Sequence, residues 1–174
     1  MDERMAITNM AVECGAKVGL MEPDTVTERF LRTACPAAEY STLWSDPDAA
    51  FEREMDFDAG ELAPLVACPH AVDNVHPAAT LNGIRLHQVY LGSCTGGRLH
   101  DLEVAAAILR GRRIAAGIRF LVSPASAGIW REAAGAGILG TLADAGATIL
   151  APTCGVCVGV HSGLLAEGER CLST

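Results

Sequence analysis

The residues most able to do chemistry in this chain of 174 residues are three cysteines, Cys94, Cys154 and Cys157. Thiolates are soft ligands that suit zinc and iron–sulfur clusters. Small or hydroxylated residues flank them, in the runs 92–97 (GSCTGG) and 153–157 (TCGVC). Glycine lets the backbone approach a bulky inorganic group closely, and its N–H can donate hydrogen bonds to sulfide. The flanks therefore favour a metal role for all three thiols.

Other interpretations of the same cysteines stay open at this point. A lone C-x-x-C pair is also compatible with a redox pair, half of a zinc site or two buried small residues. A zinc site needs a fourth ligand, which His161 or Cys171 could supply. A thioredoxin-like motif would come early in its βαβ unit, whereas here the pair follows the third expected strand. Residue types and spacing thus allow an iron–sulfur, a zinc or a purely structural role.

The elements that must position these thiols are clearest in the second half of the chain. Short apolar runs with β-branched or aromatic members predict strands, and apolar periodicity ended by glycine predicts helices. The order strand–helix–strand–helix–strand with short connections implies a parallel sheet with right-handed crossovers. Ligands bind outside the carboxyl ends of such strands, so Cys94 and Cys154 are expected at the same sheet edge. The expected strands lie in 85–94, 117–124 and 147–152, and the helices in 99–111 and 126–146.

The first half has weaker signals. Helices are expected over 4–17 and 25–34, the second capped by Asp24, with a short helix near 47–53 and extended segments near 54–58 and 64–68. Prolines and asparagines make 69–83 the best linker candidate. We therefore expect an α/β protein, three-layer α/β/α with a mostly parallel sheet and a partial second lobe at the N-terminus. Its domains would be an N-terminal α/β segment with linker, 1–83, and a parallel α/β domain, 84–174, which contains the three thiols.

Composition narrows the possible partners. The net charge of −8 argues against nucleic acid and against an anionic membrane surface. No apolar run reaches the roughly 18 residues that a membrane span needs, and no secretory signal is visible. Seven cysteines, an odd number, make a disulfide framework a poor interpretation. Free thiols in the reducing cytoplasm fit better.

Several segments resemble a known family. The runs 89–95 (VYLGSCT), 154–159 (CGVCVG) and 168–174 (GERCLST) are similar to the aconitase superfamily, as are 5–10 (MAITNM) and 13–16 (ECGA). Within it, the chain most resembles the large subunit of 3-isopropylmalate dehydratase and its homoaconitase relatives. The resemblance covers nearly the whole chain and is weakest near 35–75.

The resemblance implies a [4Fe–4S] cluster held by Cys94, Cys154 and Cys157. Three thiols leave one iron with an open position, which suits a Lewis acid. The implied reaction isomerises a hydroxy di- or tricarboxylate by dehydration and rehydration. The enzyme that the resemblance implies first is 3-isopropylmalate dehydratase of leucine biosynthesis. Homoaconitase, aconitase and a dimethylmalate-type dehydratase are alternatives. A non-catalytic or zinc-binding domain is the alternative from another class.

The resemblance also assigns roles to single residues. Asn9 and Glu13 match catalytic positions, and four positions apart on one helix they would share a face. Ser93 and Arg98 are expected near a carboxylate of the substrate. Without the resemblance, Asn9 would be an ordinary polar helix residue, and Glu13 and Arg98 would be solvated.

The same resemblance implies which partners the chain has and how much of a family large subunit it represents. It implies a small hydroxy-polycarboxylate substrate, a small subunit as protein partner, no nucleic acid and no membrane. Family large subunits are longer, with acid–base groups before the segment that matches Met1 and a substrate-binding arginine after Thr174. The family's catalytic serine base belongs to the small subunit or domain. We therefore expect this chain to be an internal fragment that does not turn over substrate alone.

Overall fold

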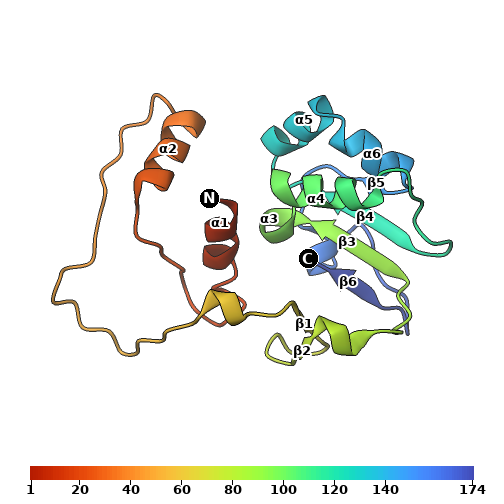
Figure 1. Cartoon of the computed structure of the whole chain (residues 1–174), viewed down its shortest axis with the longest axis horizontal. Coiled ribbons are helices and arrows are strands. Elements are labelled where there is room, and N and C mark those ends of the chain that lie inside the picture. Colours follow the sequence, from red (N-terminus) through yellow and green to blue (C-terminus); the bar gives the residue numbers. More distant parts are fainter. The chain divides into compact units, whose positions relative to one another are not determined.

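The computed structural model describes all residues from 1 to 174 and divides them into two compact units. One unit contains Met1 and residues 11–84, and the other contains residues 2–10 and 85–174 (Figure 1). The chain thus passes into the second unit after Ile84, while the short segment 2–10 groups with that unit. None of the helices has the length and hydrophobicity that a bilayer crossing requires.

The second unit is built on a four-stranded sheet in the order β5-β4-β3-β6. All neighbouring strands are parallel, which confirms the predicted α/β class. β6 was not predicted, because its three residues contain no apolar run that periodicity could detect. The strands are β3 (Gln88–Gly92), β4 (Arg119–Ser123), β5 (Thr148–Ile149) and β6 (Cys171–Ser173).

One face of this sheet is covered by three helices, α4 (Leu99–Leu109), α5 (Ala127–Gly135) and α6 (Ile138–Asp144) (Figure 1). All three fall within the ranges predicted from the sequence. Their buried side chains form the core together with alternate residues of the central strands, as a parallel sheet under crossover helices requires. The core members are Leu91, Leu102, Ala106, Phe120, Val122, Ala133, Leu139 and Leu142.

The opposite face is crossed by the connection from β5 to β6. Because β6 lies on the far side of β3 from β5, this right-handed crossover has to pass over the face that the helices leave free. It contains one short helix, α7 (Gly155–Val158), so this layer is mostly irregular chain. The fully buried Gln88 and Tyr90 of β3 lie beneath it, as their hydrogen bonds to Gly163 and Thr153 show.

The first helix is shorter than predicted. α1 spans Asp2–Asn9, not 4–17, and the bond from Met10 N to Ala6 O is its last regular one. The next residues form a separate turn that ends at Gly15, whose φ is 80°. That turn has the two closing bonds of a Schellman motif, Gly15 N to Val12 O and Ala16 N to Ala11 O. Glu13 therefore does not lie on one helix face with Asn9.

The first unit contains one helix, α2 (Thr25–Ala34), in the range predicted. Asp24 caps it, as expected, by accepting from the backbone N–H groups of Val26 and Thr27 at 3.0 Å each. β1 (Leu65–Ala67) pairs antiparallel with β2 (Val75–Pro77), and two 3₁₀ turns, η1 (Ala59–Glu61) and η2 (Ala78–Leu81), accompany them. The predicted linker 69–83 thus contains β2 and η2.

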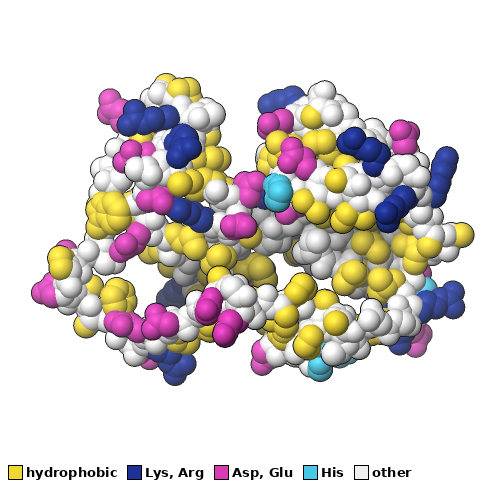
Figure 2. All heavy atoms as spheres, in the orientation of Figure 1, with side chains coloured by type: hydrophobic (Ala, Val, Ile, Leu, Met, Phe, Trp, Pro, Cys, Tyr) yellow, Lys and Arg dark blue, Asp and Glu magenta, His cyan; other side chains and the backbone are white.

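Residues 47–53 do not form the predicted short helix, and residues 54–58 contain no strand. No residue between 11 and 84 is buried, and hydrophobic side chains are exposed over this unit (Figure 2). A short helix gains most of its stability by burying an apolar face, so these segments lack what would fix their structure. The most exposed of these side chains are Leu20, Leu43, Phe57 and Val12.

Candidate metal centre

The three predicted ligands follow the carboxyl ends of the strands, as the topology required. Cys94 lies in α3 (Ser93–Gly96), which begins directly after β3. Cys154 is the N-cap residue of α7, after β5, and Cys157 lies within α7. β4 separates β3 from β5 and ends at the same edge with Ser123. Segments 60 residues apart in sequence thus reach one edge of the sheet.

A tight turn presents Cys94. Ser93 has a φ of 60° and is the one non-glycine residue of the chain in the left-handed region, a conformation that is uncommon for such residues. The turn also lies directly on β4: a Cβ added to Gly92 or Gly97 would come within 2.6 Å of the Ser123 carbonyl oxygen. Both glycines are therefore required for the close approach of this turn to the sheet.

Asn9 contacts the first of these thiols. Its Nδ2 donates a hydrogen bond of 2.9 Å to Sγ of Cys94, because α1 packs against α3. The structure thus brings a predicted catalytic residue to a predicted ligand. Glu13 is exposed and belongs to the other unit, so its relation to Cys94 stays a prediction.

Hydrogen bonds fix the loop that carries the Cys154–Cys157 pair to the sheet. Ser123, which is fully buried, accepts a hydrogen bond from Thr153 N at 3.2 Å and donates to the Ala151 carbonyl at 3.1 Å. The hydroxyl of Tyr90 donates to the Thr153 carbonyl at 3.5 Å. These bonds tie the residue before Cys154 to both central strands.

Tyr90 lies near both thiols of the Cys154–Cys157 pair. Burial raises the pKa of Tyr90 above its usual value, and the neighbouring thiols of Cys157 and Cys154 raise it further. Hydrogen bonds with the hydroxyls of Ser123 and Ser93 act in the opposite direction on this pKa. The phenol therefore stays protonated at neutral pH, with the two thiols and Ser93 around it.

The predicted donor set consists of three thiols at one edge of the sheet. All seven cysteines are free thiols; Cys154 and Cys157 are exposed and Cys94 is half-buried. No three Cys, His, Asp or Glu side chains converge closely enough to hold one metal ion. Soft thiolates are the usual ligands of iron–sulfur clusters, so the chemistry of these three residues is compatible with such a cluster.

Arg98 offers an unpaired donor beside this turn. Its Nε is buried without a hydrogen-bond partner, while its backbone N donates to the Asp101 carboxylate at 2.9 Å. A buried charged donor without a partner is costly, and an incoming carboxylate would relieve that cost. The carboxylate contact of Arg98 stays a prediction. Ser93 is 4% exposed, and its role toward substrate stays a prediction.

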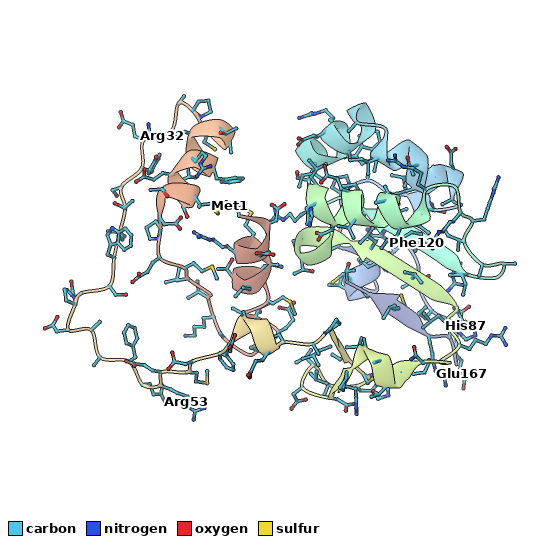
Figure 3. The ribbon with its side chains drawn as sticks, viewed as in Figure 1. Met1, Arg32, Arg53, His87, Phe120 and Glu167 are labelled. Carbon is cyan, nitrogen blue, oxygen red and sulfur yellow. The ribbon has the colours of Figure 1, made fainter.

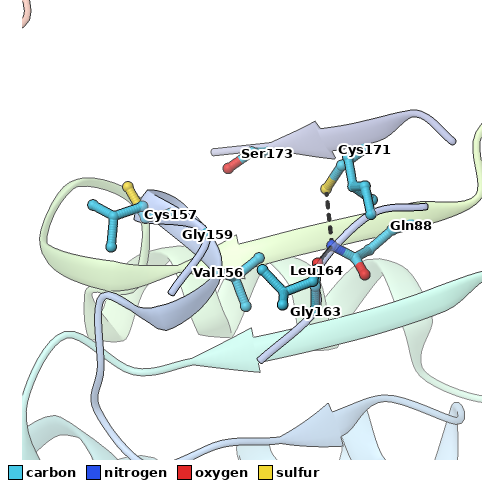
Figure 4. Close-up of a pocket in the computed structure, with 10 residues that line it drawn as sticks. Gln88, Val156, Cys157, Gly159, Gly163, Leu164, Cys171 and Ser173 are labelled. Atoms are coloured by element: carbon cyan, nitrogen blue, oxygen red, sulfur yellow. Dashed lines mark hydrogen bonds between the residues drawn. The ribbon is translucent and has the colours of Figure 1, made fainter. Parts of the chain in front are cut away.

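A cavity of about 420 Å³ lies beside α7 (Figure 4). Cys157 lies at one end, and Gln88 and Cys171 lie at the other. The buried Gln88 amide donates to the Gly163 carbonyl at 2.8 Å and to Cys171 Sγ at 3.5 Å. Gln88 thereby fixes the start of β3 to both the crossover connection and β6.

An ion pair fixes the connection between β5 and β6 at the amino end of the sheet. Arg119 pairs with Glu169 through bonds of 2.9 and 2.6 Å and donates from Nε to Gln88 Oε1 at 3.1 Å. The pair lowers the pKa of Glu169 to about 2. Figure 3 labels His87 and Glu167 at this end, where the His87 N–H donates to the Arg170 carbonyl. Sequence reasoning missed these residues, because no local spacing links partners 50 positions apart.

Comparison with known proteins identifies the family to which these residues belong. A family model described as the aconitase family (aconitate hydratase) matches residues 1–80 and 71–174, and so the whole chain. The chain belongs to the aconitase family. This aconitase-family chain is also 46% identical over 173 residues to the 3-isopropylmalate dehydratase large subunit 2 of Archaeoglobus fulgidus, covering 99% of the chain and 42% of that protein.

Two further relatives show the same pattern. The 3-isopropylmalate dehydratase large subunit of Oleidesulfovibrio alaskensis is 45% identical over 171 residues, which cover 98% of the chain and 40% of that protein. The probable methanogen homoaconitase large subunit of Methanosarcina mazei is 46% identical over 171 residues, covering 98% and 43%. This aconitase-family chain therefore spans less than half the length of the curated relatives it matches.

Proposed function

We propose that this chain is the cluster-binding part of an iron–sulfur hydro-lyase that isomerises a hydroxy di- or tricarboxylate. Enzymes of the aconitase family generally use a [4Fe–4S] cluster. The observation that supports the proposal is that Cys94 and the Cys154–Cys157 pair both follow carboxyl ends of strands at one sheet edge, with the Asn9 amide bonded to Cys94. Cys94, Cys154 and Cys157 are the residues that would hold the cluster.

When bound through three thiolates, such a cluster supplies a Lewis-acidic iron that eases departure of a hydroxyl group. The chain's own residues would then bind the substrate and orient the ligand sulfurs. The Asn9 amide holds the Cys94 sulfur in place and neutralises part of its charge. Arg98 offers its unpaired Nε–H to a substrate carboxylate, and the Ser93 hydroxyl lies in the same turn. Glu13 is the proposed acid–base group.

The proposed substrate is 3-isopropylmalate, in leucine biosynthesis. Relatives with 44% to 46% identity that carry the name 3-isopropylmalate dehydratase support it. A homocitrate-type substrate is the second candidate, supported by the equally similar homoaconitase relative. The name "large subunit" in these relatives supports a small subunit as the protein partner. Seven free thiols support the cytoplasm as the compartment.

Anaerobic reconstitution of the 174-residue chain with iron and sulfide tests the proposal. We expect about four irons and four sulfides per chain, with a broad absorption band in the blue. Adding 3-isopropylmalate should change the cluster spectrum, whereas an analogue without the hydroxyl group should not. Because the chain spans about 40% of its relatives' length, the readout is cluster and ligand binding, not turnover. Tight zinc uptake without iron would contradict the proposal.

A further inference from the structure

The residue before the cysteine pair has an unusual set of hydrogen bonds. Thr153 Oγ1 accepts from the backbone N–H of Gly155 at 3.2 Å and lies 2.8 Å from Nε2 of His161. His161 itself lies against Gly155, where an added Cβ would meet its imidazole ring. The histidine is thus held on the backbone of the C-x-x-C turn through residues that are not themselves ligands.

The other nitrogen of His161 decides the direction of this bond. The backbone N–H of Ser162 donates to Nδ1 at 2.8 Å, and the Ser162 hydroxyl lies 2.9 Å from the same atom. Nδ1 must therefore be the acceptor, which leaves the ring hydrogen on Nε2. Nε2–H consequently donates to Thr153 Oγ1, and not the reverse.

The hydroxyl of Thr153 has one hydrogen-bonding group that no other residue uses. A hydroxyl oxygen has two lone pairs and one hydrogen, and here Gly155 and His161 occupy both lone pairs. Its backbone groups are also bound, since Ser123 contacts its N–H and Tyr90 its carbonyl. The hydroxyl hydrogen is the one group of this residue that remains free to donate.

We propose that Thr153 is a positioning residue of the cluster site, whose hydroxyl donates a hydrogen bond to the sulfur atoms at the cysteine pair and is aimed by His161. This inference rests on the proposed cluster-binding function. Hydrogen bonds to the sulfurs of such clusters raise their reduction potential, because they stabilise the more negative, reduced state. His161 thus acts through Thr153 and is not a ligand.

Two substitutions separate the hydroxyl from the shape of the side chain. Thr153→Val keeps the branched shape but removes the hydroxyl, whereas Thr153→Ser keeps the hydroxyl. In the reconstituted chain, Thr153→Val should lower the reduction potential of the cluster and speed its loss in air by about tenfold, the usual effect of losing such a partner. Thr153→Ser should stay near the unmodified chain. Thermal unfolding of each cluster-free variant controls for a change in fold.

A second readout needs no cluster. Nitrogen-15 NMR of the imidazole in the cluster-free chain should show hydrogen on Nε2 of His161. Hydrogen on Nδ1 would overturn the inference, as would equal potentials and loss rates for the Val and Ser variants. If the unmodified chain takes up no cluster at all, the proposed function fails first, and the inference fails with it; a cluster that is bound but insensitive to Thr153 overturns the inference alone.

Discussion

The side-chain amide of Asn9 donates a 2.9 Å hydrogen bond to the sulfur of Cys94, a residue 85 positions away. This bond ties helix α1 to the turn that follows β3, so the N-terminal segment reaches the proposed cluster site, whose other parts lie beyond residue 85. Amide donors to a ligand sulfur orient it and lower its charge. Asn9 is therefore more than a polar residue on a helix surface.

Replacing Asn9 tests this relationship. In the reconstituted chain, Asn9→Ala should speed cluster loss in air by about tenfold, since the donor to Cys94 disappears. Iron content measured over time gives the rate. Asn82→Ala is the matched control, because the Asn82 amide bonds only locally, to the Ala79 carbonyl. Equal loss rates for the two variants would show that the Asn9 bond does not support the cluster.

The core of the second unit should respond to substitution on one face of α4 only. Leu102 is 0% exposed, and Leu102→Ala should lower the free energy of unfolding by about 2–5 kcal/mol. Val104 on the same helix is 46% exposed, and Val104→Ala should cost far less. Urea unfolding followed by circular dichroism measures both. A Val104 effect as large as that of Leu102 would contradict the packing of α4 on the sheet.

The ion pair of Arg119 and Glu169 should make stability depend on pH in acid. The pKa of Glu169 falls from 4.5 to about 2 in the folded chain, so the pair stabilises fully above the unfolded value of 4.5. That contribution is lost as the pH falls from 4.5 toward 2. The stability difference between the unmodified chain and Glu169→Gln should therefore be constant near neutral pH, shrink between pH 4.5 and 2, and vanish only below pH 2. A difference that grows on acidification would refute this assignment.

Gly155 and His161 should behave as a coupled pair. Gly155→Ala places a methyl group where the His161 ring lies, so the ring or the turn has to move. His161→Ala removes that obstacle, and the double variant should recover part of the thermal stability and iron uptake lost in Gly155→Ala. Strict additivity of the two single effects would mean that the ring does not rest on this glycine.

The sheet was predictable because its signals are local. The apolar runs ending at Gly92 and Ser123 and the helix between them each follow from short-range periodicity and glycine stops. Parallel connectivity then placed Cys94 and Cys154 at one edge without any knowledge of contacts. β6 escaped detection, since its three residues gain their strand structure from pairing with β3.

The parts that failed depend on long-range packing. The helix predicted over 4–17 ends at Asn9, so the shared face of Asn9 and Glu13 was wrong even though Asn9 does reach Cys94. Nothing in local spacing could indicate that Asn9 meets a thiol 85 residues away. The short helix expected near 47–53 does not form; none of its residues is buried, and a helix without a packed face is not stabilised.

Mössbauer spectroscopy of the chain reconstituted with iron-57 tests the central claim most directly, because it counts distinct iron environments. A cubane held by three thiols should give three similar irons and one different iron that mild oxidation removes. Each of the single replacements of Cys94, Cys154 and Cys157 with Ala should abolish the cluster signal. Cys14→Ala, at an exposed thiol outside the site, should leave that signal intact. Four equivalent irons, or a cluster that survives loss of Cys94, would contradict the account.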